Sequence, residues 1–290
     1  MKRRELLKLF GVAAGAAISA RPAGAEETRA ATGSGDPVGV LVDTTKCIGC
    51  RSCEFACAAA NGLPEPDPNV VPSPDRDTST TQWTVVKGYQ VADRTITVKR
   101  QCMHCLQPAC AAACLTKAMY KTPDGPVTWR GGDRCMGCRY CMVSCPFDVP
   151  KFEYHSATPR IQKCQLCAAR VAAGEQPACV AACPAGALTF GRRNNLLDEA
   201  RTRIYTQPAS YVHKIYGEHE VGGTSWLYLS AVPFEQIGFR TDIATTAYPT
   251  YTKEFLYAVP LVLTLVPPFL LGLRRATGGK DDPGDEGGEA

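Results

Sequence analysis

The chain has 290 residues, enough for one sizeable domain or two small ones, and its hydrophobic content of 45% is ordinary for a globular protein. The formal charge of +4 comes from the first 25 residues, which hold five basic residues and one acid, so the remainder is neutral. Charge therefore gives no support for a nucleic-acid partner.

Residues 1–25 have the organisation of an export signal. A basic start is followed by a short apolar stretch over residues 9–20 and by the small-residue site Ala23-Gly24-Ala25, after which we expect cleavage. The apolar stretch is too short to span a bilayer on its own. The Arg3-Arg4 pair resembles the bacterial twin-arginine signal, and a general secretory signal is the alternative.

Residues 26–204 hold all 16 cysteines, arranged in four quartets. Each quartet is predicted to form a close-spaced loop, followed by a short helix around the fourth cysteine and an apolar strand. The quartets are, in chain order, Cys47, Cys50, Cys53 and Cys57; Cys102, Cys105, Cys110 and Cys114; Cys135, Cys138, Cys141 and Cys145; and Cys164, Cys167, Cys179 and Cys183.

The stretches around the quartets predict both strands and helices. A Pro-rich insertion separates the first two quartets, and 11 residues separate the second and third cysteines of the fourth. The predicted elements are a strand over 38–42, a hairpin of 83–89 with 95–99, a hairpin of 117–120 with 127–129, a strand over 187–190 and a helix over 195–204.

Two such units facing each other make the small, pseudo-symmetric bacterial ferredoxin. Four repeated units therefore predict an α+β fold of two tandem bacterial-ferredoxin-like modules with insertions, which we expect to span residues 26–204. Residues 205–254 are rich in aromatic side chains and without regular patterning. They are interpreted as an irregular connection that docks on a partner.

Residues 255–273 contain no charge over 19 residues. As a helix they reach about 28 Å and can cross a membrane. Pro260, Pro267 and Pro268 are tolerated in a transmembrane helix that packs against neighbours. Arg274 and Arg275 follow, so the positive-inside rule places this end in the cytoplasm and the cysteine-rich part outside. A buried C-terminal hairpin is the alternative, and residues 274–290 are predicted to be a disordered cytoplasmic tail.

The third quartet has the spacing C-x2-C-x2-C-x3-C-P, which holds [4Fe-4S] clusters in bacterial ferredoxins, and the first quartet shares it without the proline. In that arrangement the fourth cysteine binds the other cluster of the pair. Sixteen thiolates then match four clusters. Disulfides and zinc are the alternatives, but disulfides explain the repeated spacing poorly, and zinc sites usually use two knuckles far apart.

Polar residues near the quartets have competing interpretations. His104, inside the stretch CMHC, is either a ligand, as in Rieske centres, or a spacer or hydrogen-bond donor. Because four thiolates are available to each cluster, the second interpretation is favoured. Four cations either stabilise anionic clusters or are solvated surface charges. They are Lys46, Arg134, Arg139 and Lys163.

No catalytic constellation accompanies the quartets. His155, His213 and His219 make no metal-ligand pattern, and no Gly-rich nucleotide fingerprint occurs. The three tryptophans are interpreted as packing residues. Clusters without a substrate site favour an electron relay.

The quartets together resemble the four-cluster ferredoxin-type subunits of membrane-bound oxidoreductases, such as dimethyl sulfoxide reductase, formate dehydrogenase-N and hydrogenase-2 complexes. The similarity covers residues 38 to about 230 and rests on CIGCRSCEFAC, CMHCLQPACAAAC, CMGCRYCMVSCPFDVPKFEY and KCQLCAARVAAGEQPACVAACPAGALTFG. The export signal, the segment YGEHEVGGTSWLYLSAVPFE and the single C-terminal helix make the chain most similar to hydrogenase-2 iron-sulfur subunits. Leu115 stands where the family usually has proline.

The resemblance implies the ligand sets of four [4Fe-4S] clusters, because the family pairs the first quartet with the fourth and the second with the third. The implied sets are Cys47, Cys50 and Cys53 with Cys183; Cys164, Cys167 and Cys179 with Cys57; Cys102, Cys105 and Cys110 with Cys145; and Cys135, Cys138 and Cys141 with Cys114.

The resemblance also implies a function and partners. The chain would be a non-catalytic subunit that relays electrons between a periplasmic [NiFe] hydrogenase and a quinone-reactive integral membrane subunit. It would lie on the periplasmic side of the bacterial inner membrane, with a single membrane pass. The alternatives are the beta subunit of a formate dehydrogenase or another molybdopterin oxidoreductase, a self-contained reductase and a purely structural anchor.

Overall fold

The computed structural model describes residues 35–131 and 133–277. The predicted export signal lies outside the described residues, as does the predicted tail beyond residue 277. Contacts group the described residues up to Tyr251 into one unit and those from Thr252 onward into another.

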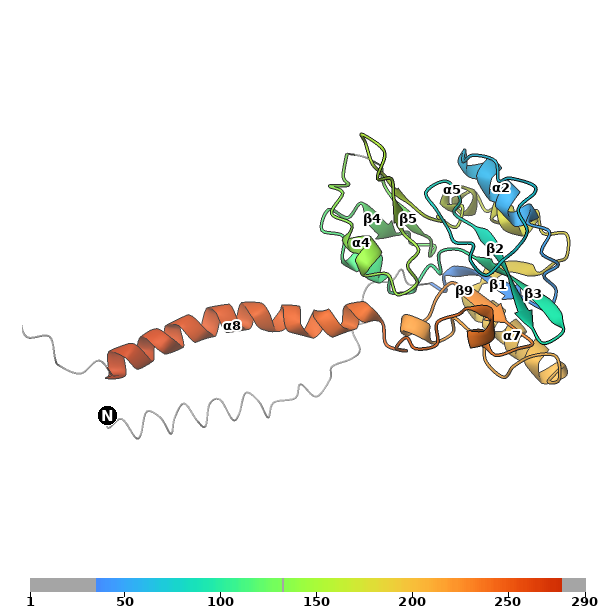
Figure 1. The fold of residues 1–290 in the computed structure, drawn as a ribbon. Coiled ribbons are helices and arrows are strands. Elements are labelled where there is room, and N and C mark those ends of the chain that lie inside the picture. Colours follow the sequence, from blue (N-terminus) through green and yellow to red (C-terminus); the bar gives the residue numbers. More distant parts are fainter. Residues whose placement is uncertain (1–34, 132, 278–290) are drawn as a thin grey trace, which may run out of the picture. The chain divides into compact units, whose positions relative to one another are not determined.

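A three-stranded sheet joins distant segments of the larger unit (Figure 1). Strand β1 (Val38–Asp43) pairs antiparallel with β8 (Leu188–Arg192) and parallel with β9 (Trp226–Leu229), so β1 is central. It is rich in valine and buried along its whole length, as expected for a strand covered on both faces. The predicted strands at 38–42 and 187–190 are confirmed.

Two hairpins lie between the quartets. Strand β2 (Val85–Val91) pairs with β3 (Arg94–Arg100), and β4 (Met119–Lys121) pairs with β5 (Val127–Trp129), so both predicted hairpins are confirmed. A further pair, β6 (Lys151–Phe152) with β7 (Ile161–Gln162), was not predicted. Strands of two residues are too short to produce an alternating pattern in the sequence.

Four helices carry the third cysteine of each quartet. They are α2 (Ser52–Asn61), α3 (Ala109–Ala112), α4 (Tyr140–Val143) and α6 (Ala178–Ala181). The prediction of a helix around the fourth cysteine is right only for α2, which contains Cys57; the other three helices end before it. Proline follows Cys145 and Cys183 and disfavours helical backbone there, whereas Ala58 lets α2 continue.

Helix α5 (Ala168–Ala172) lies in the insertion of the fourth quartet, and α7 (Arg193–Thr206) follows β8 directly. Helix α7 packs on β1, β8 and β9, which confirms the predicted helix at 195–204. Its buried side chains include Leu196, Leu197 and Ala200. They form a second apolar cluster with Leu41 and Leu227 of the sheet.

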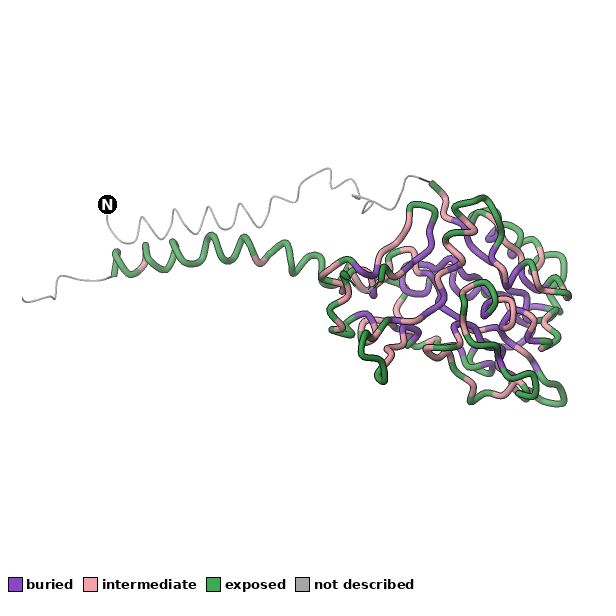
Figure 2. The backbone as a smooth tube through the Cα atoms, turned by 90° about the horizontal axis from the view of Figure 1, so that it is seen from above, coloured by how far each residue is buried: buried purple, intermediate pink, exposed green. Residues whose placement is uncertain are grey.

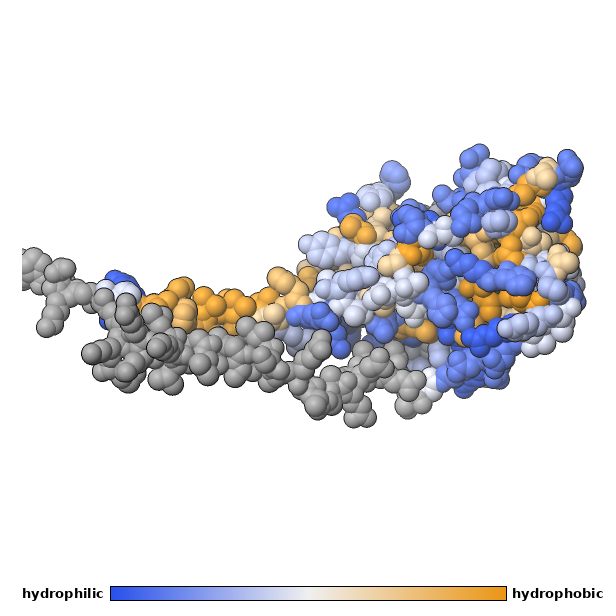
Figure 3. Space-filling model, turned by 90° about the horizontal axis from the view of Figure 1, so that it is seen from below, coloured by the Kyte–Doolittle hydropathy of each residue, from blue (hydrophilic) through white to orange (hydrophobic). Residues whose placement is uncertain are grey.

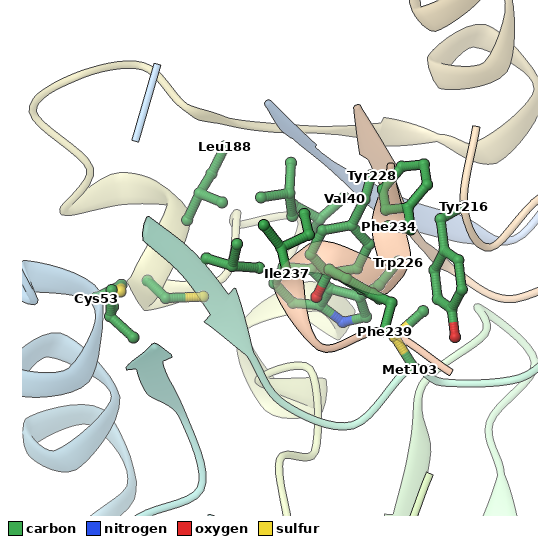
Figure 4. Close-up of a cluster of buried hydrophobic side chains, with 14 of the residues drawn as sticks. Val40, Cys53, Met103, Leu188, Tyr216, Trp226, Tyr228, Phe234, Ile237 and Phe239 are labelled. Atoms are coloured by element: carbon green, nitrogen blue, oxygen red, sulfur yellow. The ribbon is translucent and has the colours of Figure 1, made fainter. Parts of the chain in front are cut away.

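The segment after α7 belongs to the core of this unit. The expectation of an irregular connection is wrong for residues 226–229, which form β9 with all four side chains buried. The short helices η1 (Glu220–Gly222) and η2 (Phe234–Ile237) flank it. Figure 4 shows Trp226 and Tyr228 packed with Phe234 and Phe239, and Figure 2 shows buried backbone throughout this unit. Its interior is therefore filled partly by side chains that lie after the last quartet.

Helix α8 (Tyr248–Thr277) is a single helix of 30 residues that includes the predicted span at 255–273. Its most apolar 18-residue window has a mean hydropathy of 2.0, and none of that window is buried. Figure 2 shows the helix exposed along its length, and Figure 3 shows its hydrophobic surface. By length and composition it is a candidate single-pass membrane anchor.

Candidate iron-sulfur sites

The four cysteine loops share one backbone turn. In each loop the residue two positions after the first cysteine has left-handed backbone: Gly49 (φ 72°), His104 (φ 48°), Gly137 (φ 68°) and Leu166 (φ 51°). Glycine adopts this conformation at no steric cost, whereas histidine and leucine rarely do. The same turn thus recurs at the same position of all four quartets.

Two cavities are each lined by four cysteines that come from two quartets. We call the first of these sets site A, with Cys47, Cys50, Cys53 and Cys183. The second set is site B, with Cys57, Cys164, Cys167 and Cys179. In both, the fourth cysteine of one quartet joins three cysteines of the other, which are the groupings implied by the family resemblance.

The other eight cysteines form two further groups, defined by their electrostatic interactions. The thiol of Cys105 interacts with those of Cys102, Cys110 and Cys145, a set that we call site C. The thiol of Cys141 interacts with those of Cys114, Cys135 and Cys138, which we call site D. Sites C and D therefore also exchange one cysteine between quartets.

The four sites follow one another in the order A, B, C, D. Cys53 of site A interacts with Cys179 of site B. Cys57 and Cys164 of site B share an apolar cluster with Cys102 of site C. A separate cluster joins the cysteines of sites C and D, among them Cys110, Cys114, Cys135 and Cys141. The described residues thus hold a continuous series of cysteine sites.

The exposure of the cysteines separates the end sites from the inner sites. Cys50 of site A and Cys138 of site D are exposed, whereas every cysteine of sites B and C is buried or half-buried. Apolar side chains accompany the exposed cysteines, with Ile48 at 68% exposure beside site A and Met136 at 64% beside site D. The fully exposed cysteines of the series therefore lie at its two end sites.

The chemistry of the cysteines fits a bound group that needs thiolates. All 16 are free thiols. Burial raises the pKa of several of them, to about 11 for Cys57 and Cys145 and about 12 for Cys110. At Cys114 burial acts the same way, but hydrogen bonds, including one from the Met119 N–H at 3.3 Å, lower the pKa overall. A positively charged iron centre would replace these protons when it binds.

A single zinc ion does not fit this arrangement. Four thiolates around one zinc ion would have their sulfurs about 4 Å apart. Within residues 35–131 and 133–277, no three cysteine, histidine, aspartate or glutamate side chains converge on a point where one ion could sit. The cysteine sets of the described residues are therefore not gathered around a single-ion centre.

Site B offers hydrogen-bond donors as well as thiolates. Trp83 and Trp226 both line its cavity and are almost fully buried. Among the described residues, neither indole N–H has a hydrogen-bond acceptor. Buried donors without acceptors are costly, and sulfur atoms bound in the cavity would be acceptors for them. The interpretation of these tryptophans as packing residues is therefore incomplete.

His104 is fully buried beside site C, and its Nδ1 accepts a hydrogen bond of 2.9 Å from the Val127 N–H. Burial, together with the nearby charge of Lys163, lowers the pKa of His104 well below its ordinary value. Lys163 is itself buried and donates to the carbonyl oxygens of Val127 and Cys164. The other three cations noted from the sequence, Lys46, Arg134 and Arg139, are exposed.

Comparison with known proteins connects these sites to a family. A family model described as a 4Fe-4S dicluster domain matches residues 94–193, which include the second, third and fourth quartets. A protein of Nitratidesulfovibrio vulgaris is 47% identical over 97% of this chain and 78% of its own length. Hydrogenase-2 operon protein HybA of Escherichia coli O157:H7 is 34% identical over 99% of this chain and 98% of its own length. The chain belongs to the HybA-like family of 4Fe-4S iron-sulfur subunits.

The HybA-like family is related to a second group of iron-sulfur subunits. The iron-sulfur subunit of the nitrate-inducible formate dehydrogenase of Escherichia coli K12 is 34% identical over 66% of this chain and 67% of its own length. As a HybA-like subunit, this chain is an iron-sulfur electron-transfer protein.

The sequence did not reveal one residue of this HybA-like subunit that lies among the sites. Lys99 lines the cavity of site A and is only 2% exposed. It belongs to strand β3, whose other side chains alternate in the manner of a half-exposed hairpin. A lysine three positions before Cys102 gives no sequence signal that it faces cysteines of the first and fourth quartets.

Proposed function

We propose that the chain holds one [4Fe-4S] cluster at each of sites A, B, C and D and relays electrons along that series. The observation that carries the proposal is the order of the sites together with the exposure of cysteines at sites A and D alone. Such clusters, when bound, accept and release single electrons. Electrons would enter at one end of the series and leave at the other.

The chain's own residues have definite roles in this proposal. The cysteines hold the iron, and the buried apolar side chains around sites B and C exclude water. Backbone N–H groups that donate to sulfur, such as Leu166 to Cys164 at 3.4 Å, stabilise the thiolate form. No general acid, base or nucleophile is assigned, because the relay moves electrons only.

The proposed ligand sets divide the fold into two ferredoxin-like modules. Helices α2 and α6, which hold cysteines of sites A and B, pack on each other, and α3 packs on α4 between sites C and D. The shared left-handed turn in all four loops supports a fourfold repeated unit. The modules would lie within residues 26–204, with the strand β9 contributed by the segment that follows.

The partners of this relay are proposed from the relatives. HybA is named for the hydrogenase-2 operon, and it matches this chain over nearly the full length of both proteins. We therefore assign a [NiFe] hydrogenase as electron donor or acceptor and a quinone-reactive integral membrane subunit at the other end. The formate dehydrogenase subunits support a molybdenum enzyme as the alternative partner.

The proposed location is the periplasmic face of the bacterial inner membrane. Residues 1–25 would be removed as an export signal, α8 would cross the membrane once, and Arg274 and Arg275 would mark the cytoplasmic end. Residues 274–290 would form a cytoplasmic tail. Cleavage after Ala25 would give the mature protein an N-terminus at Glu26. Mass spectrometry of the mature protein tests this.

Purification of the intact complex under anaerobic conditions tests the function. We expect iron and acid-labile sulfide equivalent to four [4Fe-4S] clusters per chain and EPR signals of reduced clusters. Stoichiometric zinc, or iron for only two clusters, would contradict the proposal. Nickel in the same preparation identifies a hydrogenase partner, whereas molybdenum identifies the alternative.

A further inference from the structure

A buried ammonium group lies between sites A and B. Lys99, near the end of β3, lines the cavity of site A and extends its Nζ over the ring of Trp226, 4.2 Å from the ring centroid. Trp226 in turn lines the cavity of site B. The Lys99 ammonium therefore sits between the two cysteine sets that the first and fourth quartets build.

The neighbours of Lys99 hold its ammonium in place without neutralising it. Its Nζ donates to the side-chain oxygen of Gln101 at 2.9 Å and to the hydroxyl of Thr84 at 3.4 Å. No carboxylate in the described residues forms an ion pair with it. A buried charge normally requires a partner of opposite sign. The negative partners within reach are the cysteines.

The electrostatic effect of Lys99 spans both sites. Its charge is the largest Coulombic influence on Cys53 of site A and on Cys57, Cys164 and Cys179 of site B, where it opposes the increase in pKa caused by burial. Burial acts to lower the pKa of Lys99 itself, and the nearby thiols of Cys179, Cys53 and Cys164 act to raise it.

We propose that Lys99 is a positioning residue that sets the reduction potentials of sites A and B together. This inference rests on the proposed binding of clusters at these sites. Reduction adds one electron to a site, and a fixed positive charge nearby stabilises the added negative charge and raises the potential. Because Lys99 is shielded from solvent, counterions screen this effect little.

The shared position has a consequence for electron transfer within the chain. A cation near both sites raises the reduction potential of each. It therefore changes the difference between the two potentials less than it changes either potential. The driving force for transfer from one site to the other therefore changes little. The charge would make the module formed by sites A and B easier to reduce as a whole.

Potentiometric EPR titration of the intact complex with Lys99→Met tests the inference. We expect the reduction potentials of two clusters to fall while those of the other two stay unchanged. Reference proteins with Cys50→Ser and Cys167→Ser assign the two shifted signals to sites A and B. The matched control is Lys87→Met on the neighbouring strand β2, where the lysine forms an ion pair with Asp77 at 2.7 Å. This control should leave all four potentials unchanged.

Two further variants separate charge from packing. Lys99→Arg keeps the positive charge and should keep the potentials, and Lys99→Gln should lower them as Lys99→Met does. Unchanged potentials in a neutral variant with full iron content would overturn the inference, as would loss of clusters in all three variants alike. If Lys99→Arg were the one variant of the three that kept its clusters, the result would support the inference. Iron content below four clusters in the unsubstituted complex would instead contradict the proposed function.

Discussion

At the level of single residues, the fourth cysteine of each quartet is close in sequence to its own quartet. In space it lies with three cysteines of another quartet. Cys145 follows Cys141 by four positions, but its thiol interacts with that of Cys102 in site C. The thiol of Cys141 interacts instead with site D. One short stretch of chain thus places cysteines in two sites, and the assignment of each cysteine can be tested separately.

Replacement of Cys145 by serine should remove the cluster of site C and leave that of site D. The matched variant Cys138→Ser, in the same quartet, should remove the cluster of site D instead. EPR spectra of the reduced complexes, with iron content, distinguish the two outcomes. Loss of the same signal in both variants would contradict the exchanged ligand sets.

A buried carboxylate fixes the Pro-rich insertion to the first quartet. Glu54 on α2 is 1% exposed and accepts hydrogen bonds from Arg51 at 3.0 Å, Arg76 at 2.7 Å and the Val86 N–H at 2.5 Å. Both arginines also donate to backbone carbonyl oxygens, but among the described residues Glu54 is the carboxylate with which they form ion pairs. Its loss would leave their positive charge without a carboxylate partner.

Replacement of Glu54 by glutamine should lower the free energy of unfolding by about 3 kcal/mol, since one partner of a buried ionic network is removed. The urea concentration that abolishes the iron-sulfur absorbance measures the effect. Glu175→Gln serves as control because its ion pair with Arg170 is exposed, and such pairs contribute less than about 1 kcal/mol. Equal midpoints for the two variants would refute the role of Glu54.

At the level of elements, local patterns predicted the hairpins and helix α7 but not the partner strand β9. The hairpins are signalled by turn residues between alternating strands, as at Asp124-Gly125. Strand β9 pairs with β1 more than 180 positions earlier in the chain, and its continuous apolar sequence carries no mark of that partner. The position of Lys99 escaped prediction for the same reason, because it depends on long-range packing.

The candidate sites rest on cysteines that the sequence marks plainly. Cysteine spacing and family resemblance named all 16 residues, and their implied groupings match those that line the two cavities. Spacing alone could not supply the order of the sites or their unequal exposure. Those properties arise from the packing of helices such as α2 on α6, which no local pattern encodes.

The contact between β1 and β9 leaves no room for a side chain at Gly39. A Cβ there would lie 2.5 Å from the Ser225 carbonyl oxygen, which also accepts the Val40 N–H. Gly39→Ala should therefore destabilise the sheet by about 1–3 kcal/mol, measured by denaturation. Gly35→Ala, with no atom within 4 Å, is the control and should have little effect. Similar stability of both variants would argue against this close contact.

At the level of the whole molecule, the cysteine sites and the apolar helix belong to different contact units. The unit that ends at Tyr251 contains every cysteine, and α8 beyond it contributes none. The apolar surface of α8 has no cover within the described residues. Cluster binding and membrane attachment should therefore be separable.

A chain that ends after Tyr251 should keep its clusters and lose its attachment to membranes. Cell fractionation in a strain without the partner subunits tests attachment, and iron content tests cluster binding. The full chain in the same strain is the control and should remain with the membrane fraction. A truncated chain that stays with membranes would contradict the role of α8, and one without iron would contradict the separation.

The exchange of cysteines also constrains the order of biosynthesis. Every cysteine of sites C and D lies between residues 102 and 145, so these two sites can close while the rest of the chain is still on the ribosome. Site A needs both Cys47 and Cys183, and the strand β9, which pairs with β1, is made later still. Cys47, Cys50 and Cys53 are thus synthesised first, but the site that they form is among the last to have all its cysteines. Their thiols must therefore stay reduced until the chain is finished.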